Sequence, residues 1–515
     1  MESEKSQRLD KILGYGLLLL IVLTSFILGL HYIDDWDFGF HIKTGAKILE
    51  SGVPRLDPYS FRTEGREWLD AQWLFQVIIY LAYRVAGIAG LSVFIGLLTA
   101  LIWVVFSLPA WKARMIPIVL PIGILALWAS AHRIYLRPEL LTYLLTGIYL
   151  LILEHDRIRR GRLIFIIPLL QIFWANIHGL WPIGIFIIGA YFCEELILKL
   201  PKLVSQTRGP GTGDFSPRPG RMFALLAASL AVCLVNPYFY KGFLFPLTLL
   251  PETIHGSNYI KTHIEEELPP FPLFRFPLIE TPFVVIAIVS LVVLILNRKK
   301  PRPAQWLLFL AFLALGLNAR RNMAFLCLYS LPLIAQNLSA WFSRNSRPAG
   351  LQPLKMGAAI LGISLASFLD VSVVTGKFFS WDKSNRKFGA GLDYSKFPYG
   401  PAEFLKQIKW KGNIFNQLHQ GGFLIAVRDQ DWKIYVDGRT ELYGQKLIEE
   451  SFRSLKDYKF FQAEQQKWGF DAALIDRTDI MARPLLQNLS SDPAWSEVYA
   501  DHNSAVFLKK DSGNH

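Results

Sequence analysis

A series of long apolar runs, separated by short charged loops, is the feature that most constrains how this chain can fold. The first run, Ile12 to Tyr32, is about as long as a helix needs to cross the hydrocarbon core of a bilayer. Ten further runs complete the series: 89–109, 115–131, 138–154, 162–178, 183–200, 222–236, 281–297, 304–318, 323–340 and 355–372. Of the 515 residues, 52% are hydrophobic and only 18% are charged, which excludes an ordinary soluble protein. The sequence therefore predicts an α-helical polytopic membrane protein with about eleven transmembrane helices.

The basic residues give the chain a net charge of +13 and indicate how the spans are oriented. They lie in short loops and not in one patch with interleaved aromatic residues, which argues against nucleic acid as a partner. One more apolar run, Gln72 to Tyr83, is short for a span and is predicted to lie in the membrane interface. Six basic loops then share one side, as the positive-inside rule requires: 5–11, 111–114, 154–162, 202–221, 297–302 and 342–347. We expect a cytoplasmic N-terminus in a bacterial inner membrane.

The chain changes character after residue 372, where charged residues return. Short strand-like runs follow: NIFNQL, GFLIAV, KIYVDG and AALIDR, with a helical stretch near 444–468 and two final strands joined at 501–504. The sequence predicts two domains. Residues 1–372 form the transmembrane domain, with juxtamembrane helices in the outer loop 33–88. Residues 373–515 form a soluble α/β domain, which the odd number of spans places outside the cytoplasm.

An acidic and aromatic motif, HYIDDWDFGFHIKTG, follows the first apolar run directly. From Asp37 to Gly52 the apolar residues recur at roughly helical spacing, which predicts an amphipathic helix on the membrane surface. His41 is then one turn after Asp37 and faces the same way. Helix capping would account for one acid. It does not account for Asp34, Asp35 and Asp37 together among four aromatic rings, so we consider the motif a candidate active site.

Other charged residues are predicted on the same side of the membrane. The turn AHRIYLRPE (131–139) carries Arg133, Arg137 and Glu139, and the turn NIHGLWP (176–182) carries Asn176 and His178. Each turn alone is most simply a rim of charge at a helix end. Taken together, they could bind a substrate that has an anionic head group and a tail in lipid.

Two further charged clusters fall on this outer side. Arg320 and Arg321 lie at a span end, against the positive-inside rule, and such charge near lipid is costly unless it is paired or meets an anion. Arginine is well suited to phosphate. The acidic run 265–267 in the loop 236–282 is interpreted as a solvated face.

These motifs resemble the GT-C superfamily of integral membrane glycosyltransferases, in particular the protein O-mannosyltransferase and aminoarabinose (lipid A) transferase group. In that group an Asp-Glu-x-x-Tyr motif begins a helix that ends in a glycine about fifteen residues later, and Asp37 to Gly52 matches this spacing. Arg133 and Glu139 resemble a second motif, an arginine followed by an acid. Phe38 stands where the group has glutamate, and LDAQW (69–73) stands where it has Lys-Pro-Pro or His-Pro-Pro.

The chain is more similar still to a poorly characterised bacterial group of multispan proteins, and this likeness runs almost end to end. The signatures that carry it are D-x-D-x-x-x-H-x-x-x-G, DPYSF (57–61), RPEL (137–140), WANIHG (174–179), NPY (236–238) and DGRTELYG (437–444). The superfamily resemblance implies inverting transfer of a sugar from a polyprenyl-phosphate donor to a lipid, glycan or protein acceptor on the outer face.

The resemblance also implies roles for the candidate residues. Asp37 would be the base, with Asp35 as the second choice, and His41 or Glu139 would orient it or hold a divalent cation. The residues expected to bind substrate are His41, Arg133, Arg137, Asn176, His178, Arg320 and Arg321. A metal ion would be held by Asp37, Glu139 or His178, although no ligand spacing demands one.

Three other functions remain open from the sequence. A ligase or polymerase that moves a lipid-linked glycan would depend on the arginines more than on Asp37. A lipid-linked sugar transporter would need polar residues in mid-membrane, whereas runs such as FVVIAIVSLVVLIL are almost free of them. A non-catalytic membrane protein would bind glycan through the outer domain and its VDGRTELYG segment.

Overall fold

The computed structural model describes residues 2–199, 217–254, 266, 268–271, 277–298, 302–344, 351–381, 383–384, 386–428 and 432–510. Its internal contacts divide the chain into two compact units. The first unit comprises Met1–Tyr32, Ser92–Pro246 and Ile264–Ala390. The second comprises Ile33–Leu91, Leu247–His263 and Gly391–His515. The outer loop that the sequence assigns to the transmembrane domain therefore packs with the C-terminal residues.

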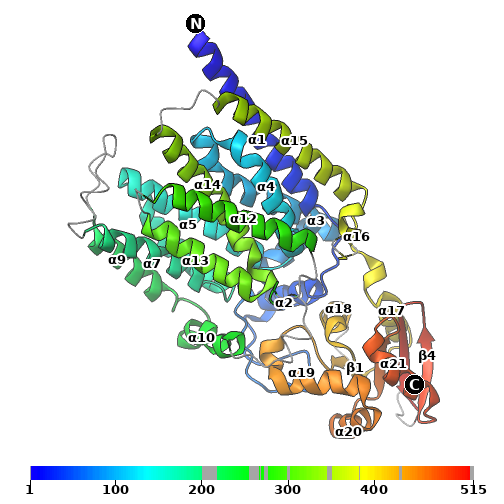
Figure 1. Ribbon diagram of the computed structural model, residues 1–515. Coiled ribbons are helices and arrows are strands. Elements are labelled where there is room, and N and C mark those ends of the chain that lie inside the picture. Colours follow the sequence, from blue (N-terminus) through cyan, green and yellow to red (C-terminus); the bar gives the residue numbers. More distant parts are fainter. Residues whose placement is uncertain are drawn as a thin grey trace. The chain divides into compact units, whose positions relative to one another are not determined.

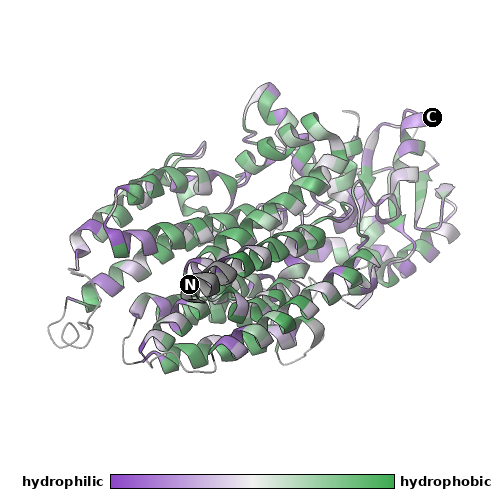
Figure 2. Cartoon of the chain, turned by 90° about the horizontal axis from the view of Figure 1, so that it is seen from above, coloured by the Kyte–Doolittle hydropathy of each residue, from purple (hydrophilic) through white to green (hydrophobic). Residues whose placement is uncertain are grey.

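The first unit is a bundle of apolar helices, which Figure 2 shows as predominantly hydrophobic. Its helices (Figure 1) are α1 (Glu2–Gly29), α4 (Ile116–Ser130), α5 (Glu139–Arg159), α6 (Ile167–Ile177), α7 (Pro182–Ile197), α9 (Pro219–Val232), α12 (Pro277–Leu296), α13 (Pro303–Asn318), α14 (Met323–Arg344), α15 (Leu351–Val374) and α16 (Lys377–Trp381). Helices α3 (Trp73–Lys112) and α10 (Tyr240–Ile254) belong partly to each unit. Each of the eleven apolar runs predicted to span coincides with one of these helices.

Six helices among the described residues are long and apolar enough to cross a membrane. They are Lys11–Gly29, Trp73–Lys112, Ile116–Arg133, Ile279–Leu296, Arg320–Arg344 and Leu351–Val374. The apolar helices Leu163–Ile177, Pro219–Val232 and Pro303–Asn318 are shorter. The prediction of a mostly helical membrane protein is confirmed, while the number of crossings and their orientation stay predictions.

Small residues let the helices of the bundle approach closely. A Cβ atom at Gly362 of α15 would lie 2.5 Å from the Leu120 side chain of α4. A Cβ atom at Gly147 of α5 would lie 2.7 Å from Val105 of α3. Helices α4 and α14 are the most buried of the six candidate spans and form the centre of the bundle.

The predicted interfacial run, Gln72 to Tyr83, forms the first part of α3. Gly87, with φ 64° and ψ −168°, breaks the helical conformation after it. A positive φ of this kind costs glycine little. The break makes 73–86 a separate helical segment, as the sequence suggests, and its place in the membrane interface stays a prediction.

The second unit begins with α2 (Phe38–Ser51), which agrees with the predicted helix. Asp37 is its N-cap residue, and Gly52, at φ 83°, ends it. The unit continues with α17 (Tyr399–Gln407), β1 (Gly412–Phe415), α18 (Gly421–Val427), β2 (Trp432–Ile434), α19 (Thr440–Lys456), α20 (Tyr458–Trp468), β3 (Ala472–Asp476), α21 (Arg483–Ser491), β4 (Trp495–Ala500) and β5 (Ser504–Lys509). The prediction of a C-terminal α/β fold is thereby confirmed.

One predicted strand is wrong, because GFLIAV forms helix α18. A short, uninterrupted apolar run does not distinguish a buried strand from a buried helix. The helix packs on α2, and a Cβ atom at Gly422 would overlap the backbone oxygen of Trp36. Gly422 therefore serves the close contact between α18 and the start of α2.

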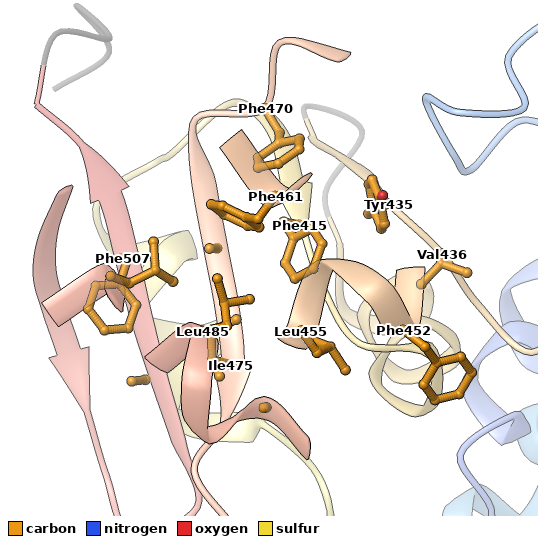
Figure 3. Close-up of a cluster of buried hydrophobic side chains, with 14 of the residues drawn as sticks. Phe415, Tyr435, Val436, Phe452, Leu455, Phe461, Phe470, Ile475, Leu485 and Phe507 are labelled. Carbon is orange, nitrogen blue, oxygen red and sulfur yellow. The ribbon is translucent and has the colours of Figure 1, made fainter. Parts of the chain in front are cut away.

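The five strands form one sheet in the order β2-β1-β3-β5-β4, parallel from β2 to β3 and antiparallel from β3 to β4. The DPYSF segment extends this sheet, because Ser60 pairs with Ile434 in parallel at the β2 edge. Phe61 of the same segment joins the aromatic core beneath the sheet. Figure 3 shows this core, in which the rings of Phe415 and Phe461 lie 5.0 Å apart. The first outer loop is thus part of the C-terminal fold.

Candidate functional site

The acidic motif of the second unit lies against the DGRTELYG segment. A Cβ atom at Gly438 would overlap the carboxylate of Asp37, so any larger residue would require this carboxylate to move. Asp35 is buried, and its carboxylate accepts the backbone N–H of Asp37 at 3.2 Å. Asp34 is buried 3.8 Å from the amine of Lys396. Of the three acids, Asp37 is the most accessible.

Aromatic rings fix the backbone of the motif on both sides of Asp37. Trp36 packs edge-on against Phe397 at 5.0 Å and against His419 at 4.6 Å. Phe38 also contacts Phe397, at 5.2 Å. Phe38, which stands where the group that the chain resembles has glutamate, is therefore buried and helps to hold the motif in place.

His419 brings a titratable group of the C-terminal residues beside the acidic motif. Its Nε2 atom lies 3.2 Å from the carboxylate of Asp476. The same carboxylate accepts hydrogen bonds from Thr478. Burial alone would raise the pKa of Asp476, but the bonds from His419 and Thr478 outweigh it and lower this pKa. The histidine is thus oriented by a carboxylate, and sequence reasoning did not single it out.

A buried arginine ties the outer loop to the DGRTELYG segment. The guanidinium of Arg439 pairs with Asp57 at 2.7 Å and with Asp437 at 2.6 Å. The Trp68 ring covers it at 4.7 Å. Asp57 also accepts the backbone N–H groups of Tyr59 and Ser60, both at 3.1 Å. The two sequence signatures DPYSF and DGRTELYG therefore meet in one ion-pair network.

Asp70, in the LDAQW stretch, is a second buried acid that sequence reasoning did not single out. Burial raises its pKa to about 7, and the nearby carboxylate of Glu441 adds to this rise. Hydrogen bonds from the Gln72 backbone and the Gln76 amide, both at 3.2 Å, oppose it in part. An acid just before an apolar helix is the only sequence signal that could have indicated it.

His41 lies on the buried face of α2, in the interior of the second unit. It is 3% exposed, and its ring meets Phe75 edge-on at 5.1 Å. Thr44 and Gly45 share this face, and a Cβ atom at Gly45 would overlap the backbone of Gln76. This face therefore packs on protein, while the place of the helix at the membrane surface stays a prediction.

The arginine cluster of the first unit is centred on Arg133, at the end of the short 3-10 helix η1 (Ala131–Arg133). Its buried guanidinium pairs with Glu139 at 2.6 Å and with Glu266 at 2.6 Å. Arg137 pairs with Glu266 at 3.1 Å. Burial alone would raise the pKa of Glu266, but the charges of Arg137, Arg133 and Arg321 outweigh it and hold this pKa well below its usual range.

Glu266 corrects one interpretation of the sequence, in which residues 265–267 form a solvated acidic face. Glu266 instead neutralises the arginines, and its neighbours 265 and 267 lie outside the described residues. Three of the predicted site residues, Arg133, Arg137 and Glu139, are brought together around it.

Arg320 and Arg321 begin the 3-10 helix η4 (Arg320–Asn322). The backbone oxygen of Arg320 accepts a hydrogen bond from His132 Nε2 at 3.0 Å, and its guanidinium lies 3.9 Å from Glu280. The charge of Arg321 acts on Glu266. Arg321 therefore belongs with the Arg133 cluster, whereas Arg320 is directed to Glu280.

Asn176 and His178 lie at the end of α6 and mainly serve packing in this structure. Nδ1 of His178 lies 2.9 Å from the hydroxyl of Thr142, which also accepts the indole N–H of Trp174 at 3.1 Å. Asn176 donates to the backbone oxygen of Val235 at 2.8 Å. His178 thus contacts α5 at Thr142, which lies one helical turn after Glu139.

In the part of the chain that the structure describes, no three His, Cys, Asp or Glu side chains are grouped so that they could hold a metal ion. The donor set expected from Asp37, Glu139 and His178 is divided between the two units. No step of the reaction proposed below depends on a metal ion.

Comparison with known proteins identifies the fold. No protein-family model matches the sequence, and no curated protein matches it either. The oligosaccharyltransferase of Archaeoglobus fulgidus matches 90% of this chain and 69% of its own, with 11% identity and a TM-score of 0.52. ArnT of Cupriavidus metallidurans, in a structure bound to undecaprenyl phosphate, matches 97% of this chain and 98% of its own, with 14% identity and a TM-score of 0.53.

These matches define the class of the fold, which is that of the GT-C integral membrane glycosyltransferases predicted from the motifs. The match to ArnT extends over nearly the whole of both chains, the C-terminal α/β residues included. At this level of identity the likeness concerns the fold, and the chemistry must be argued from this chain's own residues.

Proposed function

We propose that this chain is a membrane glycosyltransferase, which moves a sugar from a polyprenyl-phosphate donor to an acceptor at the outer face of the bacterial cytoplasmic membrane. The observation that carries the proposal is the end-to-end fold match to ArnT, whose structure holds undecaprenyl phosphate. The match to the Archaeoglobus fulgidus oligosaccharyltransferase supports the same class of reaction, because that protein is also named as a transferase of sugars.

Asp37 is the base in this proposal, and Asp35 is its positioning residue. Asp37 is partly exposed at the N-terminus of α2, whereas the buried Asp35 carboxylate already accepts the Asp37 N–H. Asp37 takes the proton from the acceptor hydroxyl or amine as the oxygen or nitrogen of that group attacks the anomeric carbon of the sugar. The bond from this carbon to the phosphate oxygen breaks, and the polyprenyl phosphate leaves as an anion with the bonding electrons. The sugar is inverted in one step.

The arginine cluster supplies positive charge for the leaving phosphate. The guanidinium of Arg133 is only 2% exposed and already lies between Glu139 and Glu266, so it positions its neighbours. The Arg137 side chain is 24% exposed, and Arg321 is also partly exposed, so these two are the phosphate ligands of the proposal. Glu139, paired with Arg133, orients that arginine and is not the base.

The test uses the purified full chain in proteoliposomes that contain sugar-labelled undecaprenyl phosphate, with native membrane extract as the source of acceptor. We expect transfer of label and release of undecaprenyl phosphate, both lost in Asp37→Asn and reduced in Arg137→Ala. Arg159 is an exposed arginine outside the cluster. If Arg159→Ala loses as much transfer activity as Arg137→Ala, Arg137 has no specific role. Full activity of Asp37→Asn with complete loss in Arg137→Ala would favour the glycan ligase instead.

A further inference from the structure

The first unit has an open pocket of about 410 Å³ at the end of the bundle where α4 and α15 begin. It is lined by Lys11, Leu13, Gly14, Tyr15, Trp111, Lys112, Arg114, Ile116, Pro117 and Lys355. Helix α4 runs from this pocket toward the Arg133 turn, so the pocket and the arginine cluster lie at opposite ends of that helix. The roles proposed above leave the pocket unassigned.

Four of the ten lining residues are cationic, and no aspartate or glutamate is among the described residues that line the pocket. Lys11, Lys112 and Arg114 are exposed, while Lys355 is only 9% exposed. Lys355 also lies in the first turns of α15, so the positive end of that helix adds to its charge. Anions are therefore strongly favoured in this pocket.

The walls between the cations are apolar and aromatic. The rings of Tyr15 and Trp111 lie 5.4 Å apart, and Leu13, Ile116 and Pro117 complete the wall. Such rings are typical of the level at which lipid head groups meet acyl chains. The pocket thus offers both charge for a head group and an apolar surface for the start of a chain.

The apolar surface continues out of the pocket along the two flanking helices. Ile12 and Leu19 of α1 are 60% and 57% exposed, and Leu354 and Met356 of α15 are 50% and 58% exposed. Free phosphate would gain nothing from such a surface, whereas two acyl chains would bury part of it. This continuity favours a lipid over a soluble anion.

We propose that the pocket binds the phosphate head group of an anionic glycerophospholipid, with its acyl chains along α1 and α15. The positive-inside rule predicts that this end faces the cytoplasm, where basic pockets between helices commonly hold such head groups. The site is independent of the transfer reaction proposed above, because it uses none of the residues assigned to it.

Native mass spectrometry of the detergent-solubilised full chain tests the site, with dioleoyl phosphatidylglycerol and dioleoyl phosphatidylcholine as probes. We expect the affinity for phosphatidylglycerol to be at least tenfold higher than the affinity for phosphatidylcholine. Each basic residue near an anionic head group contributes roughly fivefold in affinity, so Lys112→Gln with Arg114→Gln should weaken the affinity for phosphatidylglycerol by about 25-fold. Lys11→Gln alone should weaken it by about fivefold, which keeps the test open if the double variant fails to fold.

The matched control is Arg159→Gln with Arg162→Gln, two exposed basic residues at the end of α5 and just after it, both outside the pocket. This control should leave phosphatidylglycerol affinity unchanged. Equal retention of the two lipids, unchanged affinity in the pocket variants or an equal loss in the control would overturn the proposal. Displacement of the lipid by millimolar inorganic phosphate would show that the pocket takes the bare anion, which also contradicts it.

Discussion

The acidic motif of the second unit and the arginine cluster of the first unit are both dense in charge, but different interactions hold them. Asp37 is fixed by shape, through a glycine that fits beside its carboxylate and aromatic rings on its flanks. Arg133 and Arg137 are fixed by charge, through Glu139 and Glu266. The proposed base is therefore left accessible, while carboxylates offset most of the positive charge at the proposed phosphate site.

The largest effect on stability is expected at Arg439, which joins the outer loop to the DGRTELYG segment. Arg439→Met leaves the buried Asp57 and Asp437 carboxylates unpaired, so the free energy of unfolding should fall by about 3–5 kcal/mol. Urea denaturation of the full chain in detergent measures this change. Arg453→Met removes an exposed ion pair with Asp457 and should cost less than about 1 kcal/mol. Equal losses in the two variants would contradict the assigned role of Arg439.

Asp70 should give the second unit a distinctive pH dependence. Its folded pKa, about 7, is above the ordinary value of 3.8, so the folded state binds this proton more tightly than the unfolded chain does. Its contribution to stability is present below pH 4 and is lost as the pH rises to 7, by at most about 4 kcal/mol. Asp70→Asn should therefore be more stable than the wild type at pH 8, as thermal unfolding across pH would show.

A variant of Glu441 sharpens this prediction. Glu441→Gln removes a charge that raises the pKa of Asp70. The loss of stability should then still begin near pH 4, but it should be complete at a lower pH and be smaller than in the wild type. The same pH profile in Asp70→Asn and wild type would show that another group causes it.

Gly438→Ala tests whether shape fixes the acidic motif. The new methyl group overlaps the Asp37 carboxylate, and overpacking of this kind costs about 1–3 kcal/mol. Transfer activity should fall at least tenfold, because the proposed base is displaced. Gly189→Ala is the control, since nothing lies within 4 Å of a Cβ atom there. Wild-type turnover in Gly438→Ala would mean that the position of Asp37 does not matter.

The smallest effect is expected at Glu266, which tests whether charge fixes the arginine cluster. Glu266→Gln leaves Arg133 paired with Glu139 and frees Arg137 from its carboxylate. The affinity for undecaprenyl phosphate should rise by about two- to fivefold, since one kcal/mol corresponds to about fivefold. Isothermal titration in detergent measures it. A fall in affinity would mean that Glu266 organises the arginines more than it neutralises them.

The sequence predicts the elements that follow a local rule. The apolar runs locate the helices of the bundle, and helical spacing with Gly52 as a stop gives both ends of α2. The short run GFLIAV follows no such local rule, because its helical structure depends on the contact of Gly422 with the backbone of Trp36. Local pattern alone cannot supply a contact between residues so distant in sequence.

In the candidate site, too, the sequence indicates local features but not contacts between distant residues. Its acids and arginines are visible in the sequence as charged residues beside apolar runs. Their partners are not, because Asp57 and Arg439 are 382 positions apart and Arg133 and Glu266 are 133 positions apart. The assignment of the outer loop to the C-terminal fold follows from such pairs and was beyond the sequence.

In the proposed reaction Asp37 acts as the base and Asp35 positions it. The most direct measurement compares Asp37→Asn with Asp35→Asn for turnover of labelled undecaprenyl-phosphate sugar and for affinity toward undecaprenyl phosphate. We expect Asp37→Asn to lose about 10²–10⁴ in turnover with unchanged affinity, because a general base contributes in this range. Asp35→Asn, which can still accept the Asp37 N–H, should lose tenfold or less. Undiminished turnover in Asp37→Asn would contradict the account.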